Sequence, residues 1–253
     1  MFIFTEWVPG GSLSDILKKF GKLDVYLTAR YTKQMLVGLN YLHTHDVIHL
    51  DIKPGNVLID NLGCVKLADF GASRKLVDGQ SVKVGGSNSG GGGKENETVE
   101  MLGTPYFMAP EIIRQERHGR QADIWSVACT VLNMFTGVPP WSNSSVKSSN
   151  VMALLLQIER ATGPPPYPLV LESEPFGTET DDANARQMHS HLRTFLDDCY
   201  QRNFNDRPSA IELLNYSFIN GTFSKHVIKC FTCFTCFKSN ICTSCNYRLE
   251  FFN

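Results

Sequence analysis

The stretch that decides how this chain folds is His49-Leu50-Asp51-Ile52-Lys53-Pro54-Gly55-Asn56, followed thirteen residues after its last member by Asp69-Phe70-Gly71. One short segment thus offers a carboxylate, an ammonium and a carboxamide at fixed spacing, and a second carboxylate follows it. Phosphoryl transfer requires an oriented acceptor hydroxyl, neutralised phosphate charge and bound metal ions, but little covalent chemistry from the protein. The pattern therefore predicts a site for phosphoryl transfer.

Each polar side chain of the pattern fits one of these requirements. Asp51 could accept and orient the proton of a hydroxyl, and Lys53 could neutralise the transferring phosphate. Asn56 and Asp69 carry the hard oxygen atoms that Mg²⁺ prefers. The alternative is that Asp69 only caps a turn.

The segments around this stretch are mostly helical by their apolar spacing. Between Asp24 and His45, apolar residues recur at intervals of three and four, which predicts a helix packed along one side. Ser12 is an N-cap candidate for a short helix. We expect further helices at 123–134, 192–203 and 209–214, short strands at 1–4, 47–48, 57–59 and 65–67, and polar or proline-rich connections at 142–150 and 163–186.

Composition indicates a globular protein and excludes several classes. The chain has 253 residues, of which 42% are hydrophobic, enough for one large or two small domains. A net charge of −1 predicts no nucleic-acid partner and no general attraction to membranes. No apolar run is long enough to span a bilayer, and the first residues do not resemble a secretory signal. We expect a cytoplasmic protein, with the nucleus as the alternative.

The eight cysteines fall into two groups. Cys64, Cys129 and Cys199 lie in apolar segments and are expected to be buried, reduced thiols. The other five lie between Cys230 and Cys245, with repeated spacings of two intervening residues that suit tetrahedral zinc. The alternative is a tail that has no fold and binds no metal.

The motifs together resemble those of protein kinases. Residues 49–56 resemble the kinase catalytic loop, and Asp69-Phe70-Gly71 matches the metal-binding triplet. Residues 103–111 resemble the end of the activation segment, and 123–126 the start of the large central helix. Arg207-Pro208 stands where the family has the arginine that pairs with the acid of the activation segment, here Glu111. The resemblance thus covers roughly residues 1–220, with five motifs in the family's order.

The resemblance implies an α+β, protein kinase-like fold. We expect a mainly α-helical C-terminal lobe, with the N-terminal lobe almost entirely missing. Residues 1–8 would be the last strand of that N-terminal lobe and the hinge, and 9–223 the C-terminal lobe. A flexible activation-loop insert is expected at 79–97, and a disordered Cys-rich tail at 224–253.

The resemblance also implies roles for individual residues. Thr104 would orient Asp51 and Lys53. The backbone of Glu6 and Val8 would bind the adenine edge of a nucleotide, and Leu58 would lie beneath it.

Other residues are expected to support the site. Thr5 falls at the gatekeeper position. His49 would pack under Phe70, and Asp123 would accept backbone hydrogen bonds from the catalytic loop. A buried ion pair is expected between Glu111 and Arg207.

The implied activity is transfer of the γ-phosphate of ATP, with Mg²⁺, to serine and threonine hydroxyls of a protein. Lys53 and the motif at 103–106 resemble serine/threonine rather than tyrosine kinases. The phrases 8–13 and 71–73 are most similar to the mitogen-activated protein kinase kinase kinase group, so the substrate could be another kinase. The alternative is an inactive kinase fragment that acts as a protein-binding module; the oligomeric state stays open.

Two departures from the family pattern carry expectations. The chain begins at the hinge, so the family's glycine-rich loop, strand lysine and helix glutamate do not precede it, and we expect weak ATP binding and little turnover from this polypeptide alone. Leu50 stands where the family often has an arginine that binds an activation-segment phosphate. Phosphorylation, for example at Thr98, should therefore matter less here.

Overall fold

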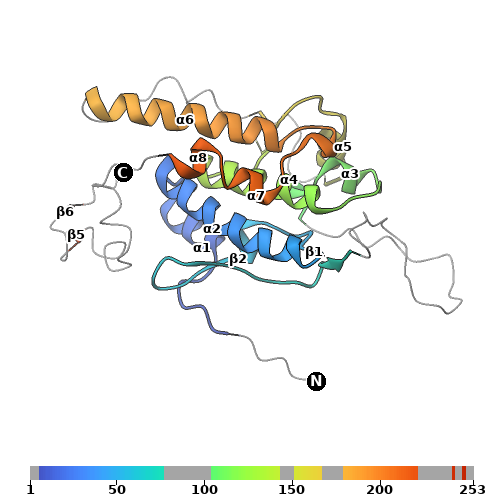
Figure 1. The fold of residues 1–253 in the computed structure, drawn as a ribbon, viewed down its shortest axis with the longest axis horizontal. Helices are drawn as coiled ribbons and strands as arrows, with labels where there is room; N and C mark the ends of the chain where they lie inside the picture. The colour runs from blue at the N-terminus through green and yellow to red at the C-terminus, as the bar shows by residue number, and fades with distance from the viewer. Residues whose placement is uncertain are drawn as a thin grey trace, which may run out of the picture.

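The computed structural model describes residues 6–76, 104–142, 151–166, 179–221, 241–242 and 247–248. Within these ranges the chain is mainly helical, with small two-stranded sheets (Figure 1). This is the α+β architecture that the sequence predicts. Several predictions lie outside the described residues: the strand at 1–4, Thr5, the insert at 79–97, Thr98, Gly103 and most of the cysteine tail. The predicted domain boundaries stay predictions.

Helix α1, Leu13–Phe20, begins where the sequence predicts. The Ser12 hydroxyl accepts from the amide of Asp15, and the Asp15 carboxylate accepts from the amide of Ser12, so both groups of a capping box are present. Leu13, Ile16 and Leu17 form the buried face. The helix is thereby fixed against the core from its first turn.

The segment before α1 is anchored to the strand β2, Val57–Ile59. The Gly11 carbonyl accepts a hydrogen bond from the Ile59 amide at 2.9 Å, and Ser12 bridges to Leu58. Gly10 lies so close to this strand that a Cβ there would meet the Ile59 carbonyl oxygen at 2.0 Å. Only glycine allows this approach.

Helix α2, Val25–Thr44, is the predicted long helix, with Asp24 as its N-cap. Its buried surface is wider than the predicted single stripe, because Thr28, Thr32 and Leu36 are buried beside it. The reason is that α2 contacts α4, α7, α8 and β3, and so is covered from more than one direction. In Figure 1 it lies near the centre of the fold.

The strands predicted at 47–48, 57–59 and 65–67 are confirmed. β2 pairs in antiparallel register with β3, Val65–Leu67, so that Val57 lies opposite Leu67. β1, Val47–Ile48, pairs with β4, Arg74–Lys75, which the sequence analysis did not predict. β4 was missed because two charged, exposed residues carry no strand pattern.

Helix α4, Arg120–Thr136, forms the centre of the core. Every residue from Ala122 to Met134 is buried, as expected for a helix that is apolar on most sides. The helix ends at Gly137, whose φ of 79° is the left-handed conformation that glycine adopts at C-termini. Two short elements precede α4: the 3₁₀ turn η2, Pro105–Phe107, and α3, Pro110–Ile113.

Several of the remaining helices differ from prediction, and the short helix α8, Ser217–Asn220, was not predicted. α5, Val151–Arg160, was not predicted. α6, Glu179–Cys199, starts thirteen residues before the predicted 192–203 and inside the predicted connection, because its sequence lacks glycine and proline. The other described elements are η1, Pro54–Asn56; η4, Phe204–Asp206; α7, Ala210–Leu213; α8, Ser217–Asn220; β5, Ile241–Cys242; and β6, Tyr247–Arg248.

Two of the three thiols predicted to be buried are buried. Cys129 in α4 and Cys199 in α6 lie in the core, where burial raises the pKa of the Cys129 thiol to about 12. The prediction for Cys64 was wrong, because that residue is exposed. It lies in the turn between β2 and β3, whose amides bond to the Asp60 carboxylate and leave the side chains outside.

None of the described helices combines the length and apolar character needed to cross a membrane.

Candidate active site

Three predicted side chains meet at Lys53. Its Nζ atom lies 2.7 Å from Asp51 Oδ2 and 2.8 Å from Thr104 Oγ1. The Asp51 and Lys53 side chains are 12% and 25% exposed, so the pair lies at the edge of the protein interior and stays accessible. Thr104 is fifty-one residues away along the chain, and its hydroxyl connects the end of the activation segment to this pair.

Asn56 joins the same cluster from the turn η1. Its Nδ2 donates to the Asp51 backbone carbonyl at 2.9 Å and to the Asp51 carboxylate at 2.8 Å. Pro54 at the start of η1 supplies a φ suited to this tight turn. Because both amide hydrogens are used in this way, the Oδ1 atom of Asn56 is the group left for a further ligand.

Asp69 is brought beside Asn56 by the β2–β3 pairing. One step beyond the ladder, the Ala68 amide donates to the Asn56 carbonyl at 2.9 Å, and Asp69 follows directly. Asp69 has a φ of 62°, and its Oδ1 accepts from the Gly71 amide at 3.3 Å. Among the described residues, none donates to Asn56 Oδ1 or Asp69 Oδ2. Two hard oxygen donors that accept no hydrogen bond from the described residues are a set that fits Mg²⁺.

The backbone of the catalytic loop is held from below by α4. Asp123 Oδ2 accepts from the His49 amide at 2.9 Å, and Asp123 Oδ1 accepts from the Leu50 amide at 2.7 Å. The His49 ring lies 5.1 Å from the ring of Phe70, between centroids. These contacts agree with the supporting roles expected for His49 and Asp123.

Glu111 and Arg207 form the expected buried ion pair. Arg207 donates from Nη1 to Glu111 Oε1 at 2.6 Å and from Nη2 to Oε2 at 2.9 Å. Arg207 also donates to the Gln121 carbonyl at the start of α4, and its guanidinium lies 5.0 Å from the ring of Trp125. The ion pair therefore attaches the segment that contains Thr104 to the core helix α4.

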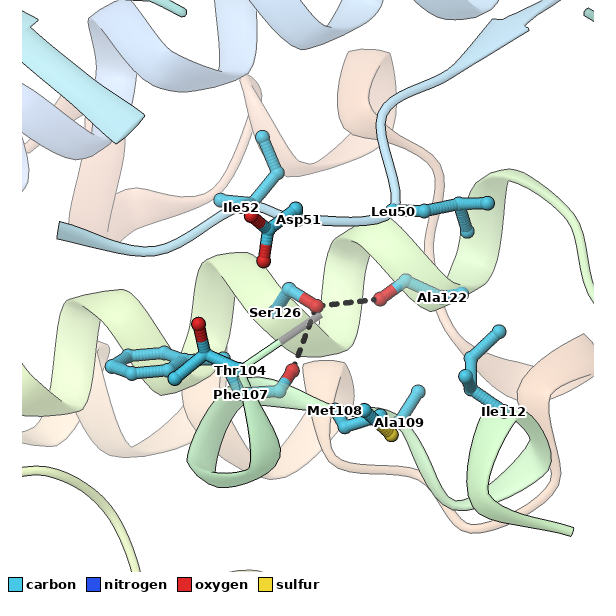
Figure 2. Close-up of a pocket in the computed structure, with 10 residues that line it drawn as sticks. All are labelled: Leu50, Asp51, Ile52, Thr104, Phe107, Met108, Ala109, Ile112, Ala122 and Ser126. Carbon is cyan, nitrogen blue, oxygen red and sulfur yellow. Dashed lines mark hydrogen bonds between the residues drawn. The ribbon is translucent and has the colours of Figure 1, made fainter. Parts of the chain in front are cut away.

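An apolar pocket opens between the catalytic loop and the segment that follows Thr104 (Figure 2). The catalytic loop forms one wall, and the segment from Thr104 to Ile112 forms the opposite wall. Ala122 and Ser126 of α4 close the back, where the Ser126 hydroxyl donates to the Phe107 carbonyl at 2.8 Å. Because Asp51 and Thr104 lie on this pocket, a side chain bound there would be next to the charged cluster.

The comparison with known proteins agrees with this geometry. The protein kinase domain matches residues 1–219 of the chain.

The chain belongs to the protein kinase family.

Several relatives of this kinase chain are named mitogen-activated protein kinase kinase kinases. Mitogen-activated protein kinase kinase kinase 3 of Arabidopsis thaliana is 42% identical over 219 residues, covering 87% of the chain and 28% of the relative. Kinase kinase kinase A of Dictyostelium discoideum is 37% identical over 217 residues, covering 86% and 19%. The human kinase kinase kinase 3 is 39% identical over 219 residues, covering 85% and 29%. The chain thus spans less than a third of each relative. The alternative of a non-catalytic binding module gains no support.

The residues predicted to form the hinge of the kinase chain, Glu6 and Val8, lie beside the β2–β3 hairpin. The Glu6 side chain forms an exposed ion pair with Lys66 of β3, Oε1 to Nζ 2.5 Å, and this hydrogen bond raises the pKa of Lys66. The Val8 carbonyl accepts from Gly11 at 3.3 Å, and Leu58 lies opposite Lys66 in the hairpin. The structure therefore places the three predicted nucleotide residues near one another; their adenine contacts stay a prediction.

The zinc prediction is not supported. Its cysteines lie outside the described residues, apart from the backbone of Cys242 in β5. Within the described part of the kinase chain there is no cluster of three or more histidine, cysteine, aspartate or glutamate side chains suited to a metal.

Sequence reasoning missed one buried polar residue of the site region. His43 Nε2 lies 2.9 Å from Asp123 Oδ2, and both side chains are buried. A signal existed, because His43 continues the buried series of Leu27, Tyr31 and Met35 at intervals of four residues. A histidine in an apolar stripe needs a buried partner.

Proposed function

We propose that this chain transfers the γ-phosphate of ATP to serine or threonine hydroxyls of a protein. The observation that carries the proposal is the cluster at Lys53, whose ammonium contacts both Asp51 and Thr104 while Asn56 contacts Asp51. Family membership supports it. A structural ion pair alone would require neither the Asn56 amide on its carboxylate nor the Thr104 hydroxyl on its ammonium.

In the proposed reaction, the oxygen of the acceptor hydroxyl forms a bond to the γ-phosphorus. The bond from that phosphorus to the bridging oxygen breaks, and ADP leaves. Asp51 orients the hydroxyl and accepts its proton, and Lys53 offsets negative charge on the transferred group. Thr104 holds Lys53 in place through its hydroxyl.

Asn56 and Asp69 are the residues that would hold Mg²⁺. The bound ion supplies neutralisation of the phosphate charge. Asn56 presents its Oδ1 atom because its amide hydrogens already bond to Asp51. The backbone of Glu6 and Val8 would bind the adenine edge, with Leu58 beneath the base.

We assign the substrate to the class of proteins, and specifically to another kinase in a mitogen-activated cascade. The printed names of the relatives support this assignment. Serine/threonine specificity is favoured by Lys53, which follows Asp51 by two residues and is bonded to Thr104. A cytoplasmic location remains our expectation, with the nucleus as the alternative.

The decisive experiment joins this chain to a segment that carries the family's glycine-rich loop, strand lysine and helix glutamate. A chimera would join this chain to the part of Arabidopsis kinase kinase kinase 3 that precedes the matched region. We expect it to transfer labelled phosphate from ATP to serine or threonine of a protein substrate. Asp51→Asn should lower kcat by roughly 10²–10⁴-fold.

The matched control is Asp197→Asn, which neutralises a half-exposed carboxylate on α6. It should leave transfer unchanged. A folded chimera without Asp51-dependent transfer to serine or threonine would overturn the proposal.

A further inference from the structure

Three large apolar side chains are exposed on the outer face of α2 and on the adjoining β2–β3 turn. Val37 and Tyr41 are four residues apart on α2, so they share one face of the helix, and they are 55% and 63% exposed. Leu62, in the turn between β2 and β3, is also 63% exposed. We call these three residues the outer strip.

The β2–β3 turn is held against α2 one helical turn before Val37. Gln34 Nε2 donates to the Gly63 carbonyl at 3.2 Å, and Gln34 Oε1 accepts from the Val65 amide at 2.9 Å. Leu62 therefore lies at the end of the outer strip nearest Gln34. Single exposed apolar residues are common, whereas a group of them on adjoining elements indicates a surface that binds another segment.

The described lobe ends beside the outer strip. Lys33 Nζ donates to Asn220 Oδ1 at 3.1 Å, and Asn220 is the last residue of α8, which contacts α2 (Figure 1). Val37 and Tyr41 lie one and two turns beyond Lys33, at about 6 and 12 Å along the helix axis. The chain that follows Asn220 therefore starts next to the outer strip.

The tail after Gly221 contains the apolar residues that such a surface requires. Residues 227–237 read Val-Ile-Lys-Cys-Phe-Thr-Cys-Phe-Thr-Cys-Phe, with phenylalanines three residues apart and Lys229 as the only charged residue. Val227 follows Asn220 by seven residues, and an extended chain of that length spans about 23 Å. Residues 227–237 are thus long enough and near enough to cover the outer strip.

We propose that residues 227–237 bind the outer strip, so that the tail packs on α2 and the β2–β3 turn of its own lobe. In this arrangement, the rings of Phe231 and Phe234 cover Val37 and Tyr41. Because the tail is tethered, its local concentration at the strip is on the order of millimolar, which favours even a small apolar contact. The proposal replaces our expectation of disorder for these residues, and it is independent of the proposed phosphoryl transfer.

The exposed thiol of Cys64 provides a reporter beside the outer strip. Cys64 lies two residues after Leu62, whereas Cys129 and Cys199 are buried. Under a glutathione redox buffer, the rate at which Cys64 forms a disulfide with Cys233 of the same molecule reports how often the tail meets the strip. Mass spectrometry of the full chain measures this rate. Four substitutions leave Cys233 as the single thiol of the tail: Cys230→Ser, Cys236→Ser, Cys242→Ser and Cys245→Ser.

Removal of the apolar groups on either side should slow this reaction. We expect Phe231→Ser with Phe234→Ser to lower the rate on the order of tenfold, because the tether is unchanged while the apolar contact is lost. Val37→Ser with Tyr41→Ser should lower the rate by a similar factor. Combining the two pairs should lower it little further, since each pair removes the same contact.

Two controls match these variants. Phe251→Ser with Phe252→Ser removes two rings of the same kind from the tail outside residues 227–237. Met152→Ser removes a 62% exposed apolar side chain from α5. Both should leave the rate unchanged.

Equal rates in the test and control variants would overturn the proposal. A disulfide that forms only between two molecules would do the same, because the strip would then bind a second copy. Circular dichroism checks the helices of each variant. If the strip variants lose their helices, the tail pair decides the test alone, because it leaves every residue of the lobe unchanged.

Discussion

Arg207 and Glu111 form a bidentate ion pair that is closed to solvent, with the two side chains 0% and 1% exposed. The two residues are ninety-six positions apart in the chain, and the pair joins the segment of Thr104 to the loop before α7. Neither charge has water to solvate it, so each depends on the other.

Removing one member of this pair should destabilise the lobe strongly. We expect Glu111→Ala to lower the free energy of unfolding by about 3–5 kcal/mol, because Arg207 is left as an unpaired buried charge. Urea unfolding followed by circular dichroism measures this. Arg193→Ala, which removes a half-exposed partner of Asp197, should change stability by less than about 1 kcal/mol. Similar losses in the two variants would refute the prediction.

The Thr104 hydroxyl should be required for efficient transfer. Thr104→Val removes the hydroxyl at nearly constant volume, and we expect kcat of the chimera to fall roughly 10–100-fold through loss of a hydrogen bond to the Lys53 ammonium. Thr104→Ser, which keeps the hydroxyl, is the matched control and should retain most activity. Equal kcat values for the Val and Ser variants would rule out this role.

Phosphorylation at Thr98 should contribute little to activity. Leu50 carries no group that can pair with a phosphate, and in the structure it packs against the apolar core and lines the pocket beside Asp51. We therefore expect the Thr98→Ala chimera to retain most of the unmodified chimera's kcat, measured with a protein substrate. A near-complete loss would contradict this expectation.

Gly10 should be irreplaceable at its contact with β2. An added methyl group would lie 2.0 Å from the Ile59 carbonyl oxygen, so Gly10→Ala must push the hinge segment away from the strand, at a cost of about 1–3 kcal/mol. Gly163→Ala is the control, because no atom lies within 4 Å of its added methyl group. Thermal unfolding compares the two, and an unchanged melting temperature for Gly10→Ala would show the prediction to be wrong.

The buried thiols should make the fold sensitive to alkali. Because burial raises the pKa of Cys129 to about 12, the folded chain keeps this proton longer than the unfolded chain does. Its contribution to stability is complete below the ordinary thiol pKa and declines as the pH rises from there towards 12. Urea unfolding at several pH values should show a smaller alkaline loss for Cys129→Ala than for the unmodified chain. Equal losses would exclude this contribution.

Local patterns were sufficient to predict the elements that carry the catalytic residues. The stripe of α2, the cap at Ser12 and the short strands around residues 49–69 are encoded within a few turns or residues of sequence. The family motifs then indicated which polar side chains would meet, and Lys53 contacts Asp51 and Thr104 as expected. The assignment of their chemical roles remains a prediction.

Outside the family motifs, features that depend on a distant partner were missed, because the local pattern does not identify that partner. The bond from His43 to Asp123 joins residues eighty positions apart, and β4 exists only because Arg74 and Lys75 lie beside β1. Cys64 was misassigned because its residue type favours burial, whereas it lies at the end of the turn between β2 and β3, where Leu62 is exposed as well.

The ion pair of Glu111 and Arg207 also sets an order for biogenesis. A ribosome that has just made Glu111 must add ninety-six more residues before its partner exists, which takes roughly 5–20 s at ordinary rates of synthesis. During that interval the nascent segment carries an acid whose burial is not yet compensated. Formation of the buried ion pair, and with it the attachment of this segment to the core, must therefore follow translation of Arg207.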